Sequence, residues 1–410
     1  MEQQIDKYVL PNGMVVLGEP MPGVESVAFE FMLPAGAAWM PPGYCGASNV
    51  ISDWIFRGAG PWDSRKLGDA LDGLGLQRST SIGSSHLTLG SALESSNLAQ
   101  ALALYADIIL KPHLSDEQFE PARQLIIEEL RSLDDEPRQR VMLELRKRFY
   151  PEPLGRSTVG ELEDLQNLTP EKTREIAGSY LNVPQIIFAV AGKYDFDAVR
   201  RQLESVFGPS AGTPVSPREV GARGPKYTHI PHDGSQVHIG LMTSTARFTD
   251  EGYYDARMAV SVLSDGMSSR LFTEVREKRG LCYAIGARYH SLKEAAGIMC
   301  YAGTTPDKAQ ETYDVTVGEF QRLAEGISEE ELARAKIGLK ASVILHSESS
   351  SSRASAVGSD YYLLGRVRTL DEVKERIEAT SVGSVLGYVR NNPFRDFTVV
   401  TIGPKEVRVG

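Results

Sequence analysis

The sequence predicts an α+β fold built from two homologous halves, each an antiparallel sheet covered by helices. Two observations lead to this prediction: the chain repeats its own pattern once, and within each half the strands and helices come in separate runs. The length of 410 residues also fits two to three domains of ordinary size. With 41% apolar and 24% charged residues, the composition is that of a globular chain and not of a disordered or collagen-like one.

The internal repeat consists of four matches in the same order at nearly one offset. Residues 114–119 (LSDEQF) and 327–332 (ISEEEL) both place Ser before an acidic first turn, a pattern typical of a helix start, at an offset of 213. The other matches, at offsets of 210, 210 and 211, are Ala99-Gln100 with Ala309-Gln310, Leu154–Arg156 with Leu364–Arg366, and Phe188–Gly192 with Thr398–Gly403. Four ordered matches favour a duplicated fold over two unrelated domains.

The elements of the first half follow from turn signals and apolar periodicity. A hairpin is predicted at Tyr8–Leu17, because two apolar runs flank the turn signal Pro11-Asn12-Gly13. Strands are predicted at Val27–Met32 and at His86–Leu93; in the second of these, apolar and polar residues alternate as in a half-buried strand. Helices are predicted over 46–57, 63–73, 97–111, 115–134 and 138–149. Pro137 separates the last two, and the second half repeats this order.

The joint between the halves is predicted at residues 209–226 (PSAGTPVSPREVGARGPK). This stretch is rich in Pro, Gly and Ser and has no apolar period, so it is typical of a linker. The predicted domains are therefore 1–208 and 227–410.

Composition excludes several classes of protein. The 54 acidic residues outnumber the 44 Lys and Arg, and a net charge of −10 disfavours nucleic acid as a partner, although a local basic patch would escape this sum. Cys45, Cys282 and Cys300 form no CxxC, so neither a disulfide framework nor a thiolate zinc site is expected. We expect no membrane span, because no apolar run approaches about 18 residues. The polar N-terminus predicts a cytoplasmic location, or a periplasmic one if residue 1 is not the natural start.

Three segments carry a resemblance to a known family. They are Gly43–Gly60 (GYCGASNVISDWIFRGAG), the run IIEELRSLDDEP in the 115–134 helix, and residues 263–283 (LSDGMSSRLFTEVREKRGLCY). With the two-half layout and the opening Leu10–Gly13, they resemble the pitrilysin and mitochondrial processing peptidase family of zinc peptidases over essentially the whole chain. The resemblance implies two zinc-peptidase-like halves that face each other like a clam shell.

Active members of this family carry the inverted motif H-x-x-E-H, which is missing here. In the motif, two His at i and i+4 hold zinc, the Glu is the general base, and a later Glu is the third protein ligand. The framework residues Gly46 and Phe56–Gly58 place Asn49, Ser52 and Asp53 at the positions of first ligand, base and second ligand. Glu129, 76 residues after Asp53, matches the distal ligand.

Asn is a poor zinc ligand, and Ser is not a base near neutral pH. Asp53 and Glu129 alone leave a remnant of two oxygen ligands. We therefore expect no cofactor in this chain and no peptide hydrolysis by the chain alone.

The second half keeps residues to which the resemblance assigns a catalytic role. Arg276 and Tyr283 match an Arg–Tyr pair, seven residues apart, that reaches the zinc site of the facing half and hydrogen-bonds the substrate carbonyl and its oxyanion. Gly266 and Ser268, within SDGMSS, match the family's flexible Gly-rich loop, which implies contact with substrate. The resemblance also implies that a peptide adds as a strand to a sheet edge near Arg78–Ser85, although that polar segment equally fits an ordinary exposed loop.

These observations predict a non-catalytic subunit of a heterodimeric zinc metallopeptidase that acts on a peptide. A homologous partner with an intact H-x-x-E-H would hold the zinc, and this chain would supply Arg276 and Tyr283. One alternative is a peptide-binding or structural scaffold with no catalytic role. The absence of a neighbouring gene that encodes a chain with an intact H-x-x-E-H would favour this alternative. Another is a homodimeric metallopeptidase with a rebuilt metal site at Asp53 and Glu129, which requires bound metal and proteolysis by the chain alone.

Overall fold

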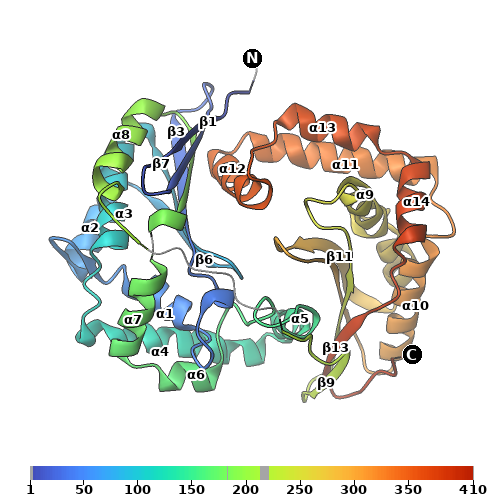
Figure 1. The fold of residues 1–410 in the computed structure, drawn as a ribbon. Coiled ribbons are helices and arrows are strands. Elements are labelled where there is room, and N and C mark those ends of the chain that lie inside the picture. The colour runs from blue at the N-terminus through green and yellow to red at the C-terminus, as the bar shows by residue number, and fades with distance from the viewer. Residues whose placement is uncertain (1–2, 182, 213–220, 410) are drawn as a thin grey trace. The chain divides into compact units, whose positions relative to one another are not determined.

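A computed structural model describes residues 3–181, 183–212 and 221–409, which form two compact units (Figure 1). Unit 1 takes the described residues of 1–132, 156–220 and 346–368. Unit 2 takes those of 133–155, 221–345 and 369–410. Each unit is therefore assembled from segments of both sequence halves.

The sheet of unit 1 has six strands in the order β1-β2-β8-β3-β7-β6. Their bounds are β1 Asp6–Val9, β2 Val15–Pro20, β3 Ser26–Leu33, β6 Gln77–Ile82, β7 Leu87–Glu94 and β8 Ile187–Gly192. Neighbouring strands are antiparallel except β2 and β8, which are parallel. β6 pairs with β7 on one side only, so it forms an edge of the sheet. A short ribbon of β4 (Gly58–Ala59) and β5 (Trp62–Asp63) lies apart from this sheet.

One face of this sheet carries the larger apolar core of unit 1. Side chains alternate along β3, and Phe29 and Phe31 point to the core, where Phe29 packs edge-on against Tyr105 at 4.9 Å between ring centroids. The helices that share this core are α1 Ala47–Trp54, α2 Ser64–Gly73, α3 Leu98–Leu110, α4 Asp116–Ser132, α6 Leu162–Asn167, α7 Pro170–Tyr180 and α8 Phe196–Phe207. Each buries one apolar side and leaves its polar side exposed, as an amphipathic helix does.

The other face of the same sheet is covered by a helix from the second half of the sequence, α12 (Ser350–Leu364). Val357 packs there with Met32 and Ala189. Arg353 donates to the Glu19 carboxylate at 2.6 and 2.9 Å, and both side chains are buried. Because both faces are covered, all six residues of β8 are buried.

The sheet of unit 2 has five strands in the order β11-β12-β10-β13-β9. Their bounds are β9 Tyr227–Pro231, β10 Val237–Ser244, β11 Cys282–Ser291, β12 Ala296–Thr304 and β13 Thr398–Gly403. Only β13 and β9 are parallel. β11 pairs with β12 alone and is an edge strand.

Helices cover both faces of this second sheet as well. The larger core involves α9 Tyr253–Ser264, α10 Ala309–Arg322, α11 Glu329–Ser347, α13 Leu370–Ala379, α14 Val382–Asn391 and the π-helical segment η5 Phe272–Glu277. The opposite face is covered by α5 (Pro137–Phe149), which lies beside this sheet in Figure 1. Leu145 of α5 packs with Met242 and Val400 in a smaller apolar cluster.

The two units thus exchange one helix each. α5 follows α4 in the first half of the sequence, and α12 follows α11 in the second, so the two exchanged helices hold equivalent places in the repeat. The compact units consequently do not coincide with the sequence ranges 1–208 and 227–410, because each sheet receives its second cover from the other half. Residues 213–220 of the predicted linker lie outside the described residues.

The predicted fold class is confirmed, since both sheets are mostly antiparallel and covered by helices. One difference is the parallel pair in each sheet, which forms because β8 and β13 return to their sheets after long helical excursions. Another is that α1 ends at Trp54 and α4 at Ser132, earlier than the ranges 46–57 and 115–134. No helix within the described ranges is both long and apolar enough to cross a bilayer.

Candidate functional site

The candidate site of unit 1 is organised by α1. This helix begins after Gly46, whose φ of +107° favours glycine; a Cβ there would come within 2.8 Å of the Leu165 side chain and 3.0 Å of Gly160. Val50, Ile51 and Trp54 are buried in the core. The residues between them therefore lie on the opposite side of the helix.

Asn49, Ser52 and Asp53 occupy that outer side and line an open pocket of about 470 Å³. Glu129 on α4 lines the same pocket, because α1 and α4 pack against each other. The structure thus brings together all four positions that the sequence assigned to the degenerate metal motif.

The polar groups of the three α1 residues are bound within the protein. The Asn49 amide donates to the Thr158 carbonyl at 3.1 Å, and the Ser52 hydroxyl donates to the Asn49 carbonyl at 2.7 Å. The Asp53 carboxylate forms an ion pair with the Arg57 guanidinium one turn later. Glu129 is exposed, and no hydrogen bond or ion pair to its carboxylate occurs within the described residues.

This donor set does not fit a catalytic zinc ion. Zinc sites of hydrolases use three His, Cys or carboxylate ligands, and here only two carboxylates face the pocket, one of them neutralised by Arg57. In the part of the chain that the structure describes, no group of three or more His, Cys, Asp or Glu side chains is placed to hold a metal ion.

An exposed strand edge forms another wall of the pocket. Arg78, Thr80 and Ser81 line it from β6, the edge strand, in which every residue but the last is exposed. The segment near Arg78–Ser85 is thus mainly a strand with a free edge and not a loop, and such an edge can accept an extended peptide.

Two residues at this site escaped the sequence analysis. In the sequence, Arg57 serves only to align the motif. Its position four residues after Asp53 on a predicted helix is nevertheless a signal for the ion pair that the structure shows. Thr158 had no signal, because its contact with Asn49 joins positions 109 residues apart.

In unit 2, the predicted Gly-rich loop connects α9 to η5. Gly266 has a φ of +85° and open space where a Cβ would be, so it permits the turn and leaves the surface uncovered. Ser268 is exposed beside Met267, of which 77% is accessible. Ser269 anchors the loop by donating its hydroxyl to the Gly266 carbonyl at 2.8 Å.

Arg276 lies in the π-helical segment η5, on the exposed side of unit 2. Its guanidinium sits over the Phe272 ring at 4.9 Å from the centroid, which orients the cation without neutralising it. Burial raises the pKa of the nearby Cys282 thiol to about 11, and the positive charge of Arg276 opposes this shift. The Phe272 contact was missed in the sequence, although the spacing of four residues could have indicated it.

Tyr283 follows Cys282 at the start of β11. Cys282 pairs with Thr304 and Ala284 with Gly303, so Tyr283 is the extra residue of a β-bulge. Bulges redirect side chains, and 69% of Tyr283 is accessible. Its phenol and the Arg276 guanidinium are therefore both exposed hydrogen-bond donors at one end of β11.

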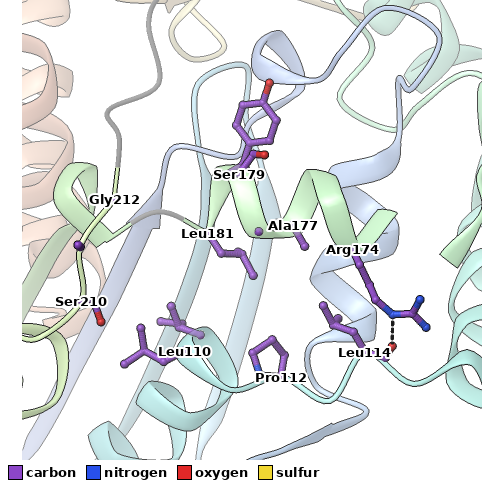
Figure 2. A pocket seen from close by; sticks show the side chains of 13 residues that line it. Leu110, Pro112, Leu114, Arg174, Ala177, Ser179, Leu181, Ser210 and Gly212 are labelled. Carbon is purple, nitrogen blue, oxygen red and sulfur yellow. Dashed lines mark hydrogen bonds between the residues drawn. The ribbon is translucent and has the colours of Figure 1, made fainter. Parts of the chain in front are cut away.

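A second pocket of about 680 Å³ in unit 1 is shown in Figure 2. Leu110, Leu114 and Ala177 line it, and Arg174 donates to the Leu114 carbonyl at 2.9 Å. It contains none of the predicted site residues, and Leu181 and Gly212 in its wall adjoin residues outside the described ranges.

Comparisons with known proteins show which family the chain is similar to. Residues 15–161 match the family described as insulinase (peptidase family M16), and residues 167–339 match the peptidase M16 inactive domain. A Bacillus subtilis protein described as an uncharacterized zinc protease is 27% identical over 410 residues, covering 98% of each chain. One from Mycobacterium tuberculosis with the same description is 26% identical over 406 residues, covering 97% of this chain and 93% of the relative.

Solved structures share the fold at lower identity. A protease from Helicobacter pylori has a TM-score of 0.90 at 20% identity, over 98% of this chain and all of the other. A peptidase M16 inactive domain from Pseudomonas fluorescens has a TM-score of 0.89 at 18% identity, and the match covers 99% of this chain and 100% of the other. A chain of complex III2 from Candida albicans has a TM-score of 0.82 at 18% identity, and the match covers 97% of this chain and 96% of the other. With matches to both M16 domains along the chain, this protein belongs to the M16 family of peptidases.

Proposed function

We propose that this chain is the non-catalytic subunit of a heterodimeric zinc metallopeptidase. The observation that carries the proposal is the pocket of α1, where all four motif positions meet but Asn49, Ser52 and Asp53 replace two ligands and the base. The exposed pair of Arg276 and Tyr283 on unit 2 supports a role in chemistry at a partner's site. A homologous chain with an intact H-x-x-E-H would hold the zinc.

In this proposal the chain contributes hydrogen-bond donors. The guanidinium of Arg276 and the hydroxyl of Tyr283 donate to the carbonyl oxygen of the scissile peptide bond. Negative charge develops on this oxygen during attack by water, so donors fixed beforehand stabilise the transition state more than the ground state. Phe272 positions Arg276, and the bulge positions Tyr283.

The first experiment is elemental analysis of the purified chain after dialysis against trace zinc. We expect far less than one zinc per chain, because no residue set at α1 fits the ion. About one zinc per chain, together with proteolysis by the chain alone, would instead support a homodimeric enzyme with a rebuilt site at Asp53 and Glu129.

The second experiment purifies a tagged chain from its own cells and identifies bound chains by mass spectrometry. We expect a homologous chain with an intact H-x-x-E-H and peptidase activity in the reconstituted pair. Arg276→Ala should lower kcat/KM by a factor of about 100 or more, the range for loss of an oxyanion donor, while assembly is unchanged.

The matched control is Arg279→Ala. Arg279 is a nearby exposed cation whose guanidinium is already paired with Glu274 at 2.8 Å, so its loss should leave turnover nearly unchanged. Equal kinetics for wild type and Arg276→Ala would contradict the proposal.

The scaffold alternative rests on the likeness to the complex III2 chain, which is a likeness of fold. It predicts a stable complex that lacks peptidase activity and contains no chain with the intact motif. The relatives described as zinc proteases favour the peptidase role.

A further inference from the structure

Three arginines surround a pair of contacting rings, the buried Tyr150 and the half-buried His290, where α5 ends in unit 2. This group, called here the Tyr150 cluster, consists of Arg146, Tyr150, Arg223, Arg288 and His290. The Tyr150 hydroxyl hydrogen-bonds Nδ1 of His290 at 2.7 Å, which joins the end of α5 to the edge strand β11. Tyr150 is buried, so this contact fixes the geometry of the cluster.

The three arginines are placed around that contact by the backbone. Arg146 lies in the last turn of α5, and its carbonyl accepts a hydrogen bond from the backbone N–H of Tyr150 at 3.0 Å, just after the helix ends. Arg288 precedes His290 by two residues and shares its face of the sheet. The Arg223 guanidinium lies over the Phe149 ring at 4.7 Å from the centroid.

The charge of this cluster is not balanced by the chain. Within the described residues, no carboxylate forms an ion pair or hydrogen bond with Arg146, Arg223 or Arg288. Burial, followed by the charges of Arg146 and Arg288, lowers the pKa of His290 to about 3. Burial also lowers the pKa of the half-buried Arg146, and the charge of Arg288 adds to this.

Arg146 is half-buried, whereas Arg223 and Arg288 are exposed. A half-buried cation without a counterion is costly, since it loses hydration and gains no partner. Two other arginines on α5 have carboxylate partners, Arg140 with Asp134 at 2.9 Å and Arg148 with Glu144, and Arg138 lies over the Tyr301 ring at 5.0 Å from its centroid. Arg146 therefore differs from Arg140 and Arg148 in the same helix. A ligand carboxylate would supply the missing charge, and the planar guanidinium can bind it through two parallel hydrogen bonds.

We propose that the Tyr150 cluster is a binding subsite for a carboxylate group of a peptide. This subsite deepens the proposed function by naming acidic peptides as the preferred ligands. It rests on the proposed function, because that function is what makes a peptide the ligand. β11 also carries Tyr283, so the subsite lies on the same edge strand as a residue assigned to the reaction. A polyanion such as nucleic acid is disfavoured, because three neighbouring arginines offer few phosphate contacts.

The test measures binding to the full chain alone, by fluorescence anisotropy at low salt. The probes are a fluorescein-labelled nonapeptide amide with two central glutamates, the same peptide with two glutamines, and the glutamine peptide with a free C-terminal carboxyl group. We expect the glutamate peptide to bind at least about tenfold more tightly than the glutamine amide. Tight binding of the third probe would show that a terminal carboxylate also serves as the ligand group.

The difference in affinity between the glutamate and glutamine amides should mostly disappear in Arg146→Gln and in Arg288→Gln. Arg146→Lys should keep part of this difference. Arg140→Gln removes the same charge from the same helix at a paired site, so it should keep the full difference. Thermal melting shows whether each variant is folded.

Equal binding of the glutamate and glutamine amides would overturn the subsite. So would a single-stranded DNA 20-mer that binds more tightly than the glutamate peptide and loses affinity in Arg146→Gln, because the cluster would then serve nucleic acid. These measurements need no zinc subunit, so their failure is distinct from a failure to find the motif-bearing partner.

Discussion

At the scale of single residues, the Asp53 carboxylate, at a predicted ligand position, is already bound by another side chain. Asp53 lines the pocket opposite Glu129, yet its carboxylate is engaged by Arg57 one turn along the chain. Asn49 is likewise held by the Thr158 carbonyl at 3.1 Å. The four predicted motif positions therefore meet at one pocket, while Asn49 and Asp53 are already bound to other groups of the chain.

This arrangement predicts that zinc binding can be restored. In a variant with Asn49→His, Ser52→Glu and Asp53→His, the two histidines lie one turn apart on α1 and face the pocket that contains Glu129. We expect close to one zinc per chain by elemental analysis. Adding Glu129→Gln should lower that content clearly. A triple variant that binds no zinc would show that α1 and α4 do not hold the ligand geometry.

A second residue-scale prediction concerns Glu30, which is buried on β3 under α12. Burial raises its pKa to about 7, and a hydrogen bond with Ser355 opposes the shift slightly. The folded chain thus keeps a proton that the unfolded chain releases near pH 4.5. The resulting stability is complete below that pH and is lost as the pH rises through 7.

Glu30→Gln removes the pH-dependent contribution of Glu30 to the free energy of unfolding. Relative to wild type, the variant's free energy of unfolding should rise between pH 5 and pH 8 by at most about 3 kcal/mol. Urea unfolding of both proteins at the two pH values measures the difference. A pH-independent difference would show that Glu30 is charged in the folded protein throughout this range.

At the scale of elements, the exchanged helices α5 and α12 need close approach to their sheets. A Cβ at Gly297 of β12 would come within 2.6 Å of the Met242 side chain and 2.9 Å of the Phe149 ring at the end of α5. In the other unit, a Cβ at Gly358 of α12 would come within 2.7 Å of Glu30. Small residues therefore set both helix–sheet distances.

Gly297→Ala should consequently destabilise unit 2 by about 1–3 kcal/mol through overpacking beneath α5. The matched control is Gly318→Ala in α10, where a Cβ would meet nothing within 4 Å. That change should be neutral or stabilise by up to about 1 kcal/mol, because alanine loses less backbone entropy in a helix. Thermal melting of both variants separates overpacking from the gain in backbone entropy. Equal changes in melting temperature for the two variants would contradict a tight contact between α5 and the sheet.

At the scale of the whole molecule, the repeat and the compact units divide the chain differently. The sheet of unit 2 lies in the second half of the sequence, but its second cover, α5, comes from the first. Without α5, the apolar side chains of Met242, Met299 and Val400 lose their cover. Exposed apolar patches of this kind promote aggregation.

A fragment of residues 227–410 should therefore be insoluble or unfolded when expressed alone. The same fragment preceded by residues 133–155 and a flexible linker, and with residues 346–368 replaced by a second linker, should be folded, because α5 can then cover the sheet and α12 no longer exposes its apolar side. Size-exclusion chromatography and thermal melting compare the two. A monomeric, cooperatively melting fragment without α5 would show that the exchanged helix is dispensable.

The sequence by itself determined the fold class and which residues stand at the four predicted motif positions. Capping patterns such as Ser328 with Glu331 are local, and the structure shows that pair bonded in both directions at 2.9 and 3.2 Å. The sequence likewise shows directly that Asn49, Ser52 and Asp53 stand where the motif H-x-x-E-H was predicted to align. Apolar alternation along strands and the 3.6-residue period of helices made most element positions predictable.

Only the tertiary structure decided which helix covers which sheet and which distant groups meet. α5 and α12 have apolar sides that their sequence cannot assign to one sheet or the other. The contacts of Thr158 with Asn49 and of His290 with Tyr150 join residues more than 100 positions apart. Sequence periodicity reports the face that an element buries, whereas its partner depends on the packing of the complete chain.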